Sequence, residues 1–137
     1  AAMTYEEIKN LRDEYVETEV LIHPECACGS EAMYYSEKNN DKDIHFLSTE
    51  AMINKAKSSS AENIIVATET GVIHKLQRTS PEKNFIPINR TATCEYMKMI
   101  TVEKVLETLK SEQPEVKVPA KIAMKAKTAI DRMVGIG

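Results

Sequence analysis

Three cysteines and a short His-Pro-Glu segment are the residues of this sequence whose types and spacing point to chemistry. Cys26 and Cys28 come shortly after His23 and Glu25, whereas Cys94 stands alone much further along the chain. A thiolate is a metal ligand or a nucleophile, and a carboxylate near an imidazole transfers protons. The odd number of cysteines argues against a disulfide framework. Because free cysteine is among the most buried residue types, a structural role is the simpler alternative for each of them.

Two pairs of polar residues also follow apolar segments. Ser48-Thr49 and Thr68-Glu69 each stand between an apolar run and a stretch with helical spacing. The free amides and the dipole of a helix N-terminus favour an anion, so Ser48 and Thr49 predict a site for a phosphate or a carboxylate. A plain helix cap is the commoner role of such a pair, and Glu69 also fits a carboxylate that only stabilises a first helical turn.

The elements that would position these residues alternate between strand and helix, with a repeat of about 20–25 residues. Apolar runs predict strands over residues 19–22, 43–47, 63–68 and 84–87, with helices between them. A further helix begins at Thr4, which forms a capping box with Glu7. Such alternation is typical of an α/β fold with a small parallel sheet, helices on both faces and right-handed crossovers. The strands show no clean period of two, as expected when both faces are covered.

The order of the strands would bring the polar residues together. In open parallel sheets, ligands bind outside the carboxyl ends of the strands. His23 and Glu25 follow the first strand, and Ser48 and Thr49 follow the second. We therefore expect these side chains, with Thr68 after the third strand, to lie along one edge of the sheet.

The C-terminal segment contains no strand pattern and predicts two helices. Residues 97–109 have the pattern of one amphipathic helix. A second helix opens at Val118-Pro119 and runs to about Met133, with its apolar residues on one stripe. These helices cover either the small sheet or a surface that the sequence does not contain.

Composition and charge exclude several classes of protein. The chain has 137 residues and a net charge of −3, and its basic residues are scattered among acidic ones. This charge pattern argues against nucleic acid and anionic membranes as partners. No apolar run approaches the about 20 residues that span a bilayer, and the N-terminus lacks the pattern of a signal peptide. The sequence therefore predicts a cytoplasmic protein in a reducing environment.

Four ordered motifs resemble those of the quinolinate synthases. His23-Pro24-Glu25-Cys26 is similar to their HPEC segment, and Leu47-Ser48-Thr49 to their GST segment, although Leu47 stands where glycine is common. Residues 67–76 resemble their GTE-x-G-x-x-H-x-L segment, and residues 92–98 resemble their cysteine followed by NMK. The stretch between the first two motifs is longer than is usual in that family. The motifs cover nearly the whole chain.

The resemblance implies an iron–sulfur enzyme of NAD biosynthesis built from three similar α/β domains around a pseudo-threefold axis. Such enzymes condense iminoaspartate with dihydroxyacetone phosphate to quinolinate, phosphate and water, and are functionally linked to L-aspartate oxidase. A 4Fe–4S cluster, held by one cysteine from each domain, acts as a Lewis acid. Residues 1–93 would be the third domain, and residues 94–137 the cluster-ligand loop and C-terminal helices. The first two domains have no counterpart in this sequence, so we expect this chain alone to be inactive and to hold no cluster.

The resemblance also implies roles for individual residues. Cys94 would be a cluster ligand, whereas Cys26 belongs to a motif without being a ligand. Glu25 would be the general base, with His23 as its catalytic neighbour, because imine and enol chemistry requires repeated proton transfers. The residues that would contact substrate are His23, Pro24, Glu25, Ser48 and Thr49.

Two other classes of protein remain as alternatives. The first is a small α/β module that binds an anionic metabolite without catalysis, through strand ends and helix amides. The second is a structural zinc domain that uses Cys26, Cys28 and a histidine, and that would lose its fold with a chelator. The spacing is poor for zinc, because no second cysteine pair exists.

Overall fold

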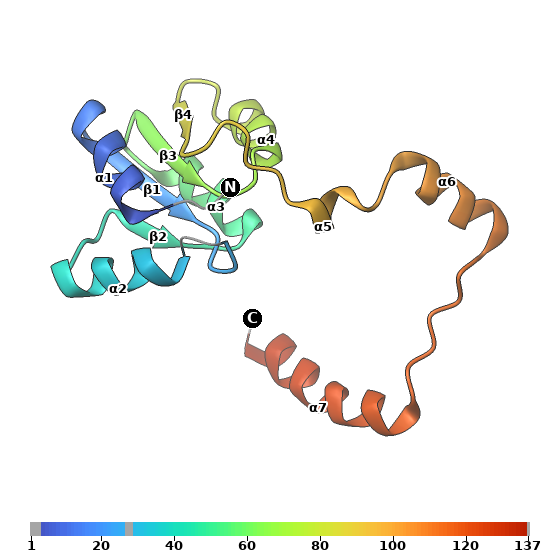
Figure 1. The fold of residues 1–137 in the computed structure, drawn as a ribbon. Coiled ribbons are helices and arrows are strands. Elements are labelled where there is room, and N and C mark those ends of the chain that lie inside the picture. Colours follow the sequence, from blue (N-terminus) through green and yellow to red (C-terminus); the bar gives the residue numbers. More distant parts are fainter. Residues whose placement is uncertain (1–3, 27–28, 137) are drawn as a thin grey trace. The chain divides into compact units, whose positions relative to one another are not determined.

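A computed structural model describes residues 4–26 and 29–136, so Cys28 lies outside the described residues. The chain divides into two compact units, Ala1–Glu95 and Tyr96–Gly137. In the first unit, parallel strands pair in the order β2-β1-β3-β4, as Figure 1 shows. The predicted α/β fold is thereby confirmed. The elements of the first unit are α1 (Tyr5–Glu14), β1 (Thr18–Ile22), α2 (Gly29–Asn39), β2 (Ile44–Phe46), α3 (Thr49–Ser58), β3 (Asn63–Ala67), α4 (Gly71–Thr79) and β4 (Asn84–Pro87).

Helices cover both faces of the sheet and create two apolar cores (Figure 1). Successive strand residues point to opposite faces, so β1, β3 and β4 each supply both cores, whereas β2 contributes Ile44 and Phe46 to the core beneath α1 and α2. Burying one such Val, Ile or Leu side chain stabilises the fold by about 1.5–3 kcal/mol. The core beneath α1 and α2 contains Ile8, Val20, Ile22, Ala32, Ile44, Ile65, Ala67 and Ile86. The core beneath α3 and α4 contains Leu21, Met52, Ile53, Ala56, Ile64, Val66, Leu76 and Phe85.

Caps fix where two of these helices begin. The Thr4 hydroxyl accepts from the Glu7 amide at 3.3 Å, and the Glu7 carboxylate accepts from the Thr4 amide at 2.7 Å, which confirms the predicted capping box. Ser48 caps α3 by accepting from the Ala51 amide at 3.4 Å. Each cap is worth about 1 kcal/mol of helix stability.

The helices of the C-terminal segment are α5 (Glu95–Lys98), α6 (Val102–Ser111) and α7 (Ala120–Ile136). The prediction of one continuous helix over residues 97–109 is wrong. Thr101 has extended backbone, and its hydroxyl accepts from the Lys104 amide at 3.3 Å, so it caps a new helix. The second predicted helix begins directly after Pro119 and continues through Gly135 to Ile136.

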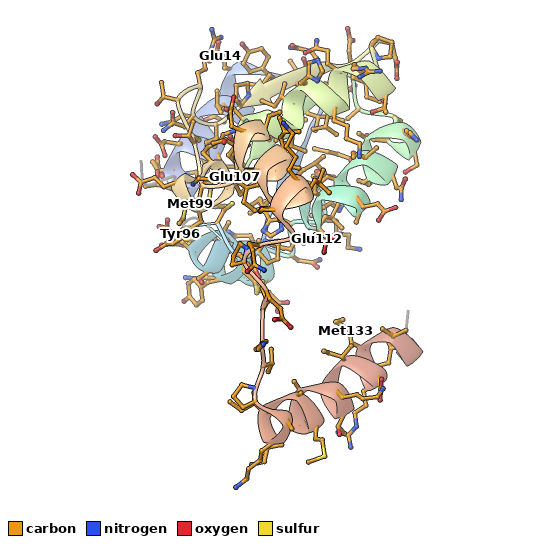
Figure 2. All side chains as sticks on the ribbon, turned by 90° about the vertical axis from the view of Figure 1, so that its right-hand side faces the viewer. Glu14, Tyr96, Met99, Glu107, Glu112 and Met133 are labelled. Atoms are coloured by element: carbon orange, nitrogen blue, oxygen red, sulfur yellow. The ribbon has the colours of Figure 1, made fainter. Side chains whose placement is uncertain are left out.

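Neither α6 nor α7 buries any of its described residues. Leu109 on α6 is 75% exposed, and Met133, labelled on α7 in Figure 2, is 66% exposed. The apolar residues of both predicted stripes are therefore exposed within the second unit taken by itself. Throughout residues 4–26 and 29–136, every helix is too short or too polar to cross a lipid bilayer.

A charged cluster that the sequence did not predict joins β1, β2 and α3. The Glu19 carboxylate lies 3.5 Å from Nε2 of His45 and 3.1 Å from Nζ of Lys55. Burial, and then the Lys55 ammonium, lower the pKa of His45 from 6.5, while the carboxylates of Glu19, Asp43 and Asp41 oppose this shift. His45 is therefore mostly neutral in the folded protein at pH 7.

Acidification is expected to destabilise the fold through His45. Because its folded pKa lies below the unfolded value of 6.5, the unfolded chain takes up the proton first, and stability present above pH 6.5 is lost as the pH falls through the folded pKa. Replacing His45 with glutamine should flatten this part of the stability–pH profile measured by urea unfolding. The matched variant His74→Gln, on the exposed side of α4, should keep the wild-type slope. If the free energy of unfolding of His45→Gln changes with pH as steeply as that of the wild type, His45 is not the cause of the destabilisation by acid.

Candidate functional site

The carboxyl ends of β1, β2 and β3 lie next to one another along one edge of the sheet. Ile22, the last residue of β1, pairs with Phe46 of β2 on one side and with Ala67 of β3 on the other. The Leu47 amide donates to the Ile22 carbonyl at 2.9 Å, which extends this register past the end of β2. Neighbouring strands lie about 4.8 Å apart. The residues that follow these strands therefore share one edge, as the strand order predicted.

The turn that carries His23 and Glu25 is closed by its own backbone. The Cys26 amide donates to the His23 carbonyl at 3.0 Å, and the Gly29 amide donates to the Cys26 carbonyl at 2.8 Å. The Glu25 amide donates to Nδ1 of His23 at 3.4 Å. With Nδ1 as the acceptor, Nε2 of a neutral imidazole carries the hydrogen and is the ring atom that can donate to a ligand. His23 is half-buried, and Glu25 is exposed.

Two further contacts hold this turn in place. The Cys26 thiol lies 3.2 Å from the Thr68 hydroxyl, which links the end of β1 to the end of β3. A Cβ atom on Gly29 would lie only 2.7 Å from the Pro24 carbonyl oxygen. The absence of a side chain at Gly29 therefore allows the start of α2 to pack directly against the turn.

Replacing Gly29 with alanine is expected to lower the free energy of unfolding by about 1–3 kcal/mol, the usual cost of overpacking. The backbone carbonyl of Pro24 cannot rotate away from the new methyl group as a flexible side chain would. Gly135→Ala on α7 is the matched control, because a Cβ there meets nothing within 4 Å. That variant should keep or raise stability, since alanine is the better helix former. Urea unfolding measures both, and equal stability of the two variants would refute the close approach at Gly29.

Ser48 and Thr49 lie at the N-terminus of α3, beside the His23 turn, and both are exposed. Ser48 acts as the helix cap described above, which is the commoner of the two roles considered for it. The first-turn amides and hydroxyl groups of this exposed end are the anion-binding elements that the sequence predicted. Binding of a substrate anion by Ser48 and Thr49 stays a prediction.

The N-terminal turn of α4 connects β3 to the loop that carries Cys94. Glu69 is buried, and its carboxylate accepts from the Gly71 amide at 2.8 Å. The amide and the hydroxyl of Thr70 both donate to the Ala92 carbonyl, at 3.0 and 3.2 Å. Cys94, a free and half-buried cysteine, follows Ala92 by two residues and belongs to the first unit. The predicted domain boundary between residues 93 and 94 stays a prediction.

Cys94 is the residue of this edge that the sequence predicts to bind a metal, and that role stays a prediction. Within residues 4–26 and 29–136, no three His, Cys, Asp or Glu side chains gather in a way that would hold a metal ion. A four-iron cluster needs three or four thiolates, so the described donor set does not hold one by itself. The zinc alternative depends on Cys28, which lies outside the described residues.

The fold and the edge define an open α/β domain that presents a polar segment after each of several parallel strands, and domains of this class bind ligands at the carboxyl edge. Residues 1–135 match the family model described as Quinolinate synthetase A protein. The chain belongs to this family, which confirms the resemblance inferred from the four motifs.

Curated relatives extend well beyond this chain. It is 42% identical to the quinolinate synthase of Thermus thermophilus over 137 residues, which cover 100% of the chain and 43% of that protein. It is 48% identical to the quinolinate synthase of Pyrobaculum aerophilum over 119 residues, or 87% of the chain and 38% of the relative. The Mycobacterium tuberculosis quinolinate synthase is 34% identical over 139 residues, with 100% and 40% covered. The chain thus spans roughly two fifths of the length of the curated relatives it matches.

Proposed function

We propose that this chain forms one wall of the active site of a quinolinate synthase. The complete enzyme would condense iminoaspartate with dihydroxyacetone phosphate to quinolinate in NAD biosynthesis. The observation that carries the proposal is the convergence at one sheet edge of the His23 turn, the N-terminus of α3 and the anchored loop before Cys94, in a member of this family.

The residues of this edge suit the parts of such a reaction. Glu25 is exposed beside the half-buried imidazole of His23, so its carboxylate is free to take a proton from a substrate carbon or nitrogen. Nε2 of His23 would donate a hydrogen bond to a substrate oxygen and hold it next to this base. The backbone of Pro24 packs closely against Gly29. This packing would hold the side chains of His23 and Glu25 in fixed positions.

The α3 N-terminus would hold the anionic end of a substrate. The substrates of this reaction carry carboxylates and a phosphate, and the free amides, the helix dipole and the Thr49 hydroxyl all favour negative charge at this position. Binding there would leave the reacting atoms over the end of β1, the neighbouring strand. Ser48 would keep the helix end rigid through its cap.

Cys94 would supply one thiolate to a 4Fe–4S cluster, and the remaining thiolates would come from residues that this sequence does not contain. When bound, such a cluster supplies a Lewis acid that polarises a substrate oxygen or nitrogen. A cytoplasmic location and a functional link to L-aspartate oxidase belong to the same proposal.

The proposal is tested with the intact protein that contains this chain and with residues 1–137 alone. Both are treated anaerobically with iron and sulfide and then assayed for quinolinate by chromatography. We expect the intact protein to form quinolinate, and the chain alone to form none and to retain no cluster. An intact protein that carries its full iron content yet forms no quinolinate, while the chain alone binds phosphate, would favour the simple anion-binding module.

A further inference from the structure

We propose that Thr70 is a positioning residue for Cys94: its amide and its hydroxyl together clamp the Ala92 carbonyl and thereby fix the loop from which the Cys94 thiolate is presented. This inference rests on the proposed function, since it takes Cys94 to be a cluster ligand. The contact between Thr70 and Ala92 is called the Thr70 clamp below.

The Thr70 hydroxyl does not do what a threonine at this position usually does. Thr70 is the residue before α4, where a threonine oxygen normally accepts from an amide of the first turn. Thr70 makes no such cap. The Glu69 carboxylate accepts from the Gly71 amide at 2.8 Å, so the first turn has a side-chain acceptor without Thr70. The hydroxyl is thereby left to donate across the sheet edge to the Ala92 carbonyl at 3.2 Å.

The segment between β4 and the clamp is held by hydrogen bonds of its own. The Ile88 amide donates to the Val66 carbonyl at 3.0 Å, and the Ala92 amide donates to the Asn89 carbonyl at 3.2 Å. The Asn89 side chain accepts from both the amide and the hydroxyl of Thr91 at 2.8 Å. The clamp therefore closes a turn that is fixed at its start, and Ala92 itself is buried.

The Thr70 clamp lies close to Cys94 along the chain. Consecutive Cα atoms lie 3.8 Å apart, so the Cα atom of Cys94 lies within about 7.6 Å of that of Ala92. Beyond the clamp, only Thr93, which is exposed, separates Ala92 from Cys94. Without the hydrogen bonds to the Ala92 carbonyl, the Cys94 thiol would move over a larger volume. A ligand that is held less firmly binds its metal less well.

The test replaces Thr70 with valine, which has the same shape but no hydroxyl, in the intact iron-free protein under reducing conditions. The readout is the rate at which N-ethylmaleimide modifies Cys94, followed by peptide mass spectrometry, with Cys26 as an internal reference. We expect the Cys94 rate to rise about two- to tenfold, the factor by which one ordinary hydrogen bond changes an opening equilibrium. Thr70→Ser, which restores the hydroxyl, should return the rate to that of the wild type.

The matched control is Thr79→Val on the same helix. The Thr79 hydroxyl donates to the carbonyls of Lys75 and Leu76 within α4, so its loss should leave the Cys94 rate unchanged. Thr70→Ala is assessed in the same way, so that a folding failure of one variant leaves the other decisive. An unchanged Cys94 rate in the folded variants, or an equal rise at Cys26, would overturn the clamp.

A second readout separates the clamp from the role of Cys94. After anaerobic reconstitution, Thr70→Val should hold less iron and sulfide per chain than the wild type, and Thr70→Ser should hold the same amount. If Cys94→Ala, whose side chain has no donor atom, retains its iron, the ligand role of Cys94 fails, while the alkylation rates still decide whether the clamp exists.

Discussion

Cys94→Ala in the intact enzyme is expected to lose the iron–sulfur cluster and, with it, quinolinate formation down to the level of the blank. The physical reason is that the side chain of alanine offers no donor atom, and a cluster that loses one of its thiolates exposes a second iron to solvent. Iron and sulfide content, the visible absorption spectrum and the rate of quinolinate formation measure the effect after anaerobic reconstitution.

Cys26→Ala is the matched control for this prediction. Cys26 is also free and half-buried, and it lies at the same sheet edge, but its thiol contacts the Thr68 hydroxyl. We expect this variant to keep its cluster and to lose only the link between the ends of β1 and β3. A Cys94→Ala protein with wild-type iron content, or a Cys26→Ala protein without a cluster, would show that the wrong thiol has been assigned.

Glu25→Gln should lower kcat by about 10²–10⁴-fold, the usual contribution of a positioned general base. Glutamine keeps the size and hydrogen-bonding shape of glutamate but cannot take up a proton. Because Glu25 is exposed in this chain, the substitution should leave both folding and the iron content unchanged. Steady-state kinetics with both substrates, on protein of equal cluster content, measures the effect.

The kinetic parameters separate a base from a binding group. If Glu25 only holds substrate, the substitution raises KM and leaves kcat close to that of the wild type, which would contradict our assignment. Glu82→Gln is the control, because Glu82 is an exposed carboxylate in the segment between α4 and β4, where the chain enters the sheet at its opposite edge. This variant should match the wild type in both parameters.

The architecture could be predicted because its signals are local. The inner strand β3 is buried on both faces, so it appears in the sequence as an unbroken apolar run, Ile64-Ile65-Val66. The capping box of Thr4 and Glu7 was equally visible, because both partners lie within one helical turn. The motifs around His23 and Cys94 identified the family for the same reason, since each is a short contiguous stretch.

The error in the C-terminal segment has a specific cause. The apolar periodicity of residues 97–109 fits one helix, but the Thr101 hydroxyl stabilises a helix start within that stretch. Threonine competes with helix continuation by hydrogen bonding to nearby backbone groups. The polar, β-branched Thr101 before Val102 is the local signal in the sequence for this break.

The sequence by itself determined the family, the order of strands and helices, and the residues that reach the carboxyl edge, because propensity, patterning and motif spacing act over a few residues. The tertiary structure alone decided which of these residues touch. The thiol of Cys26 contacts the Thr68 hydroxyl, and the Pro24 carbonyl lies against Gly29. The Thr70 hydroxyl donates to the Ala92 carbonyl, 22 positions further along the sequence. Such contacts depend on strand register and on the loops between distant elements, and register is set by the packing of the whole sheet against its helices.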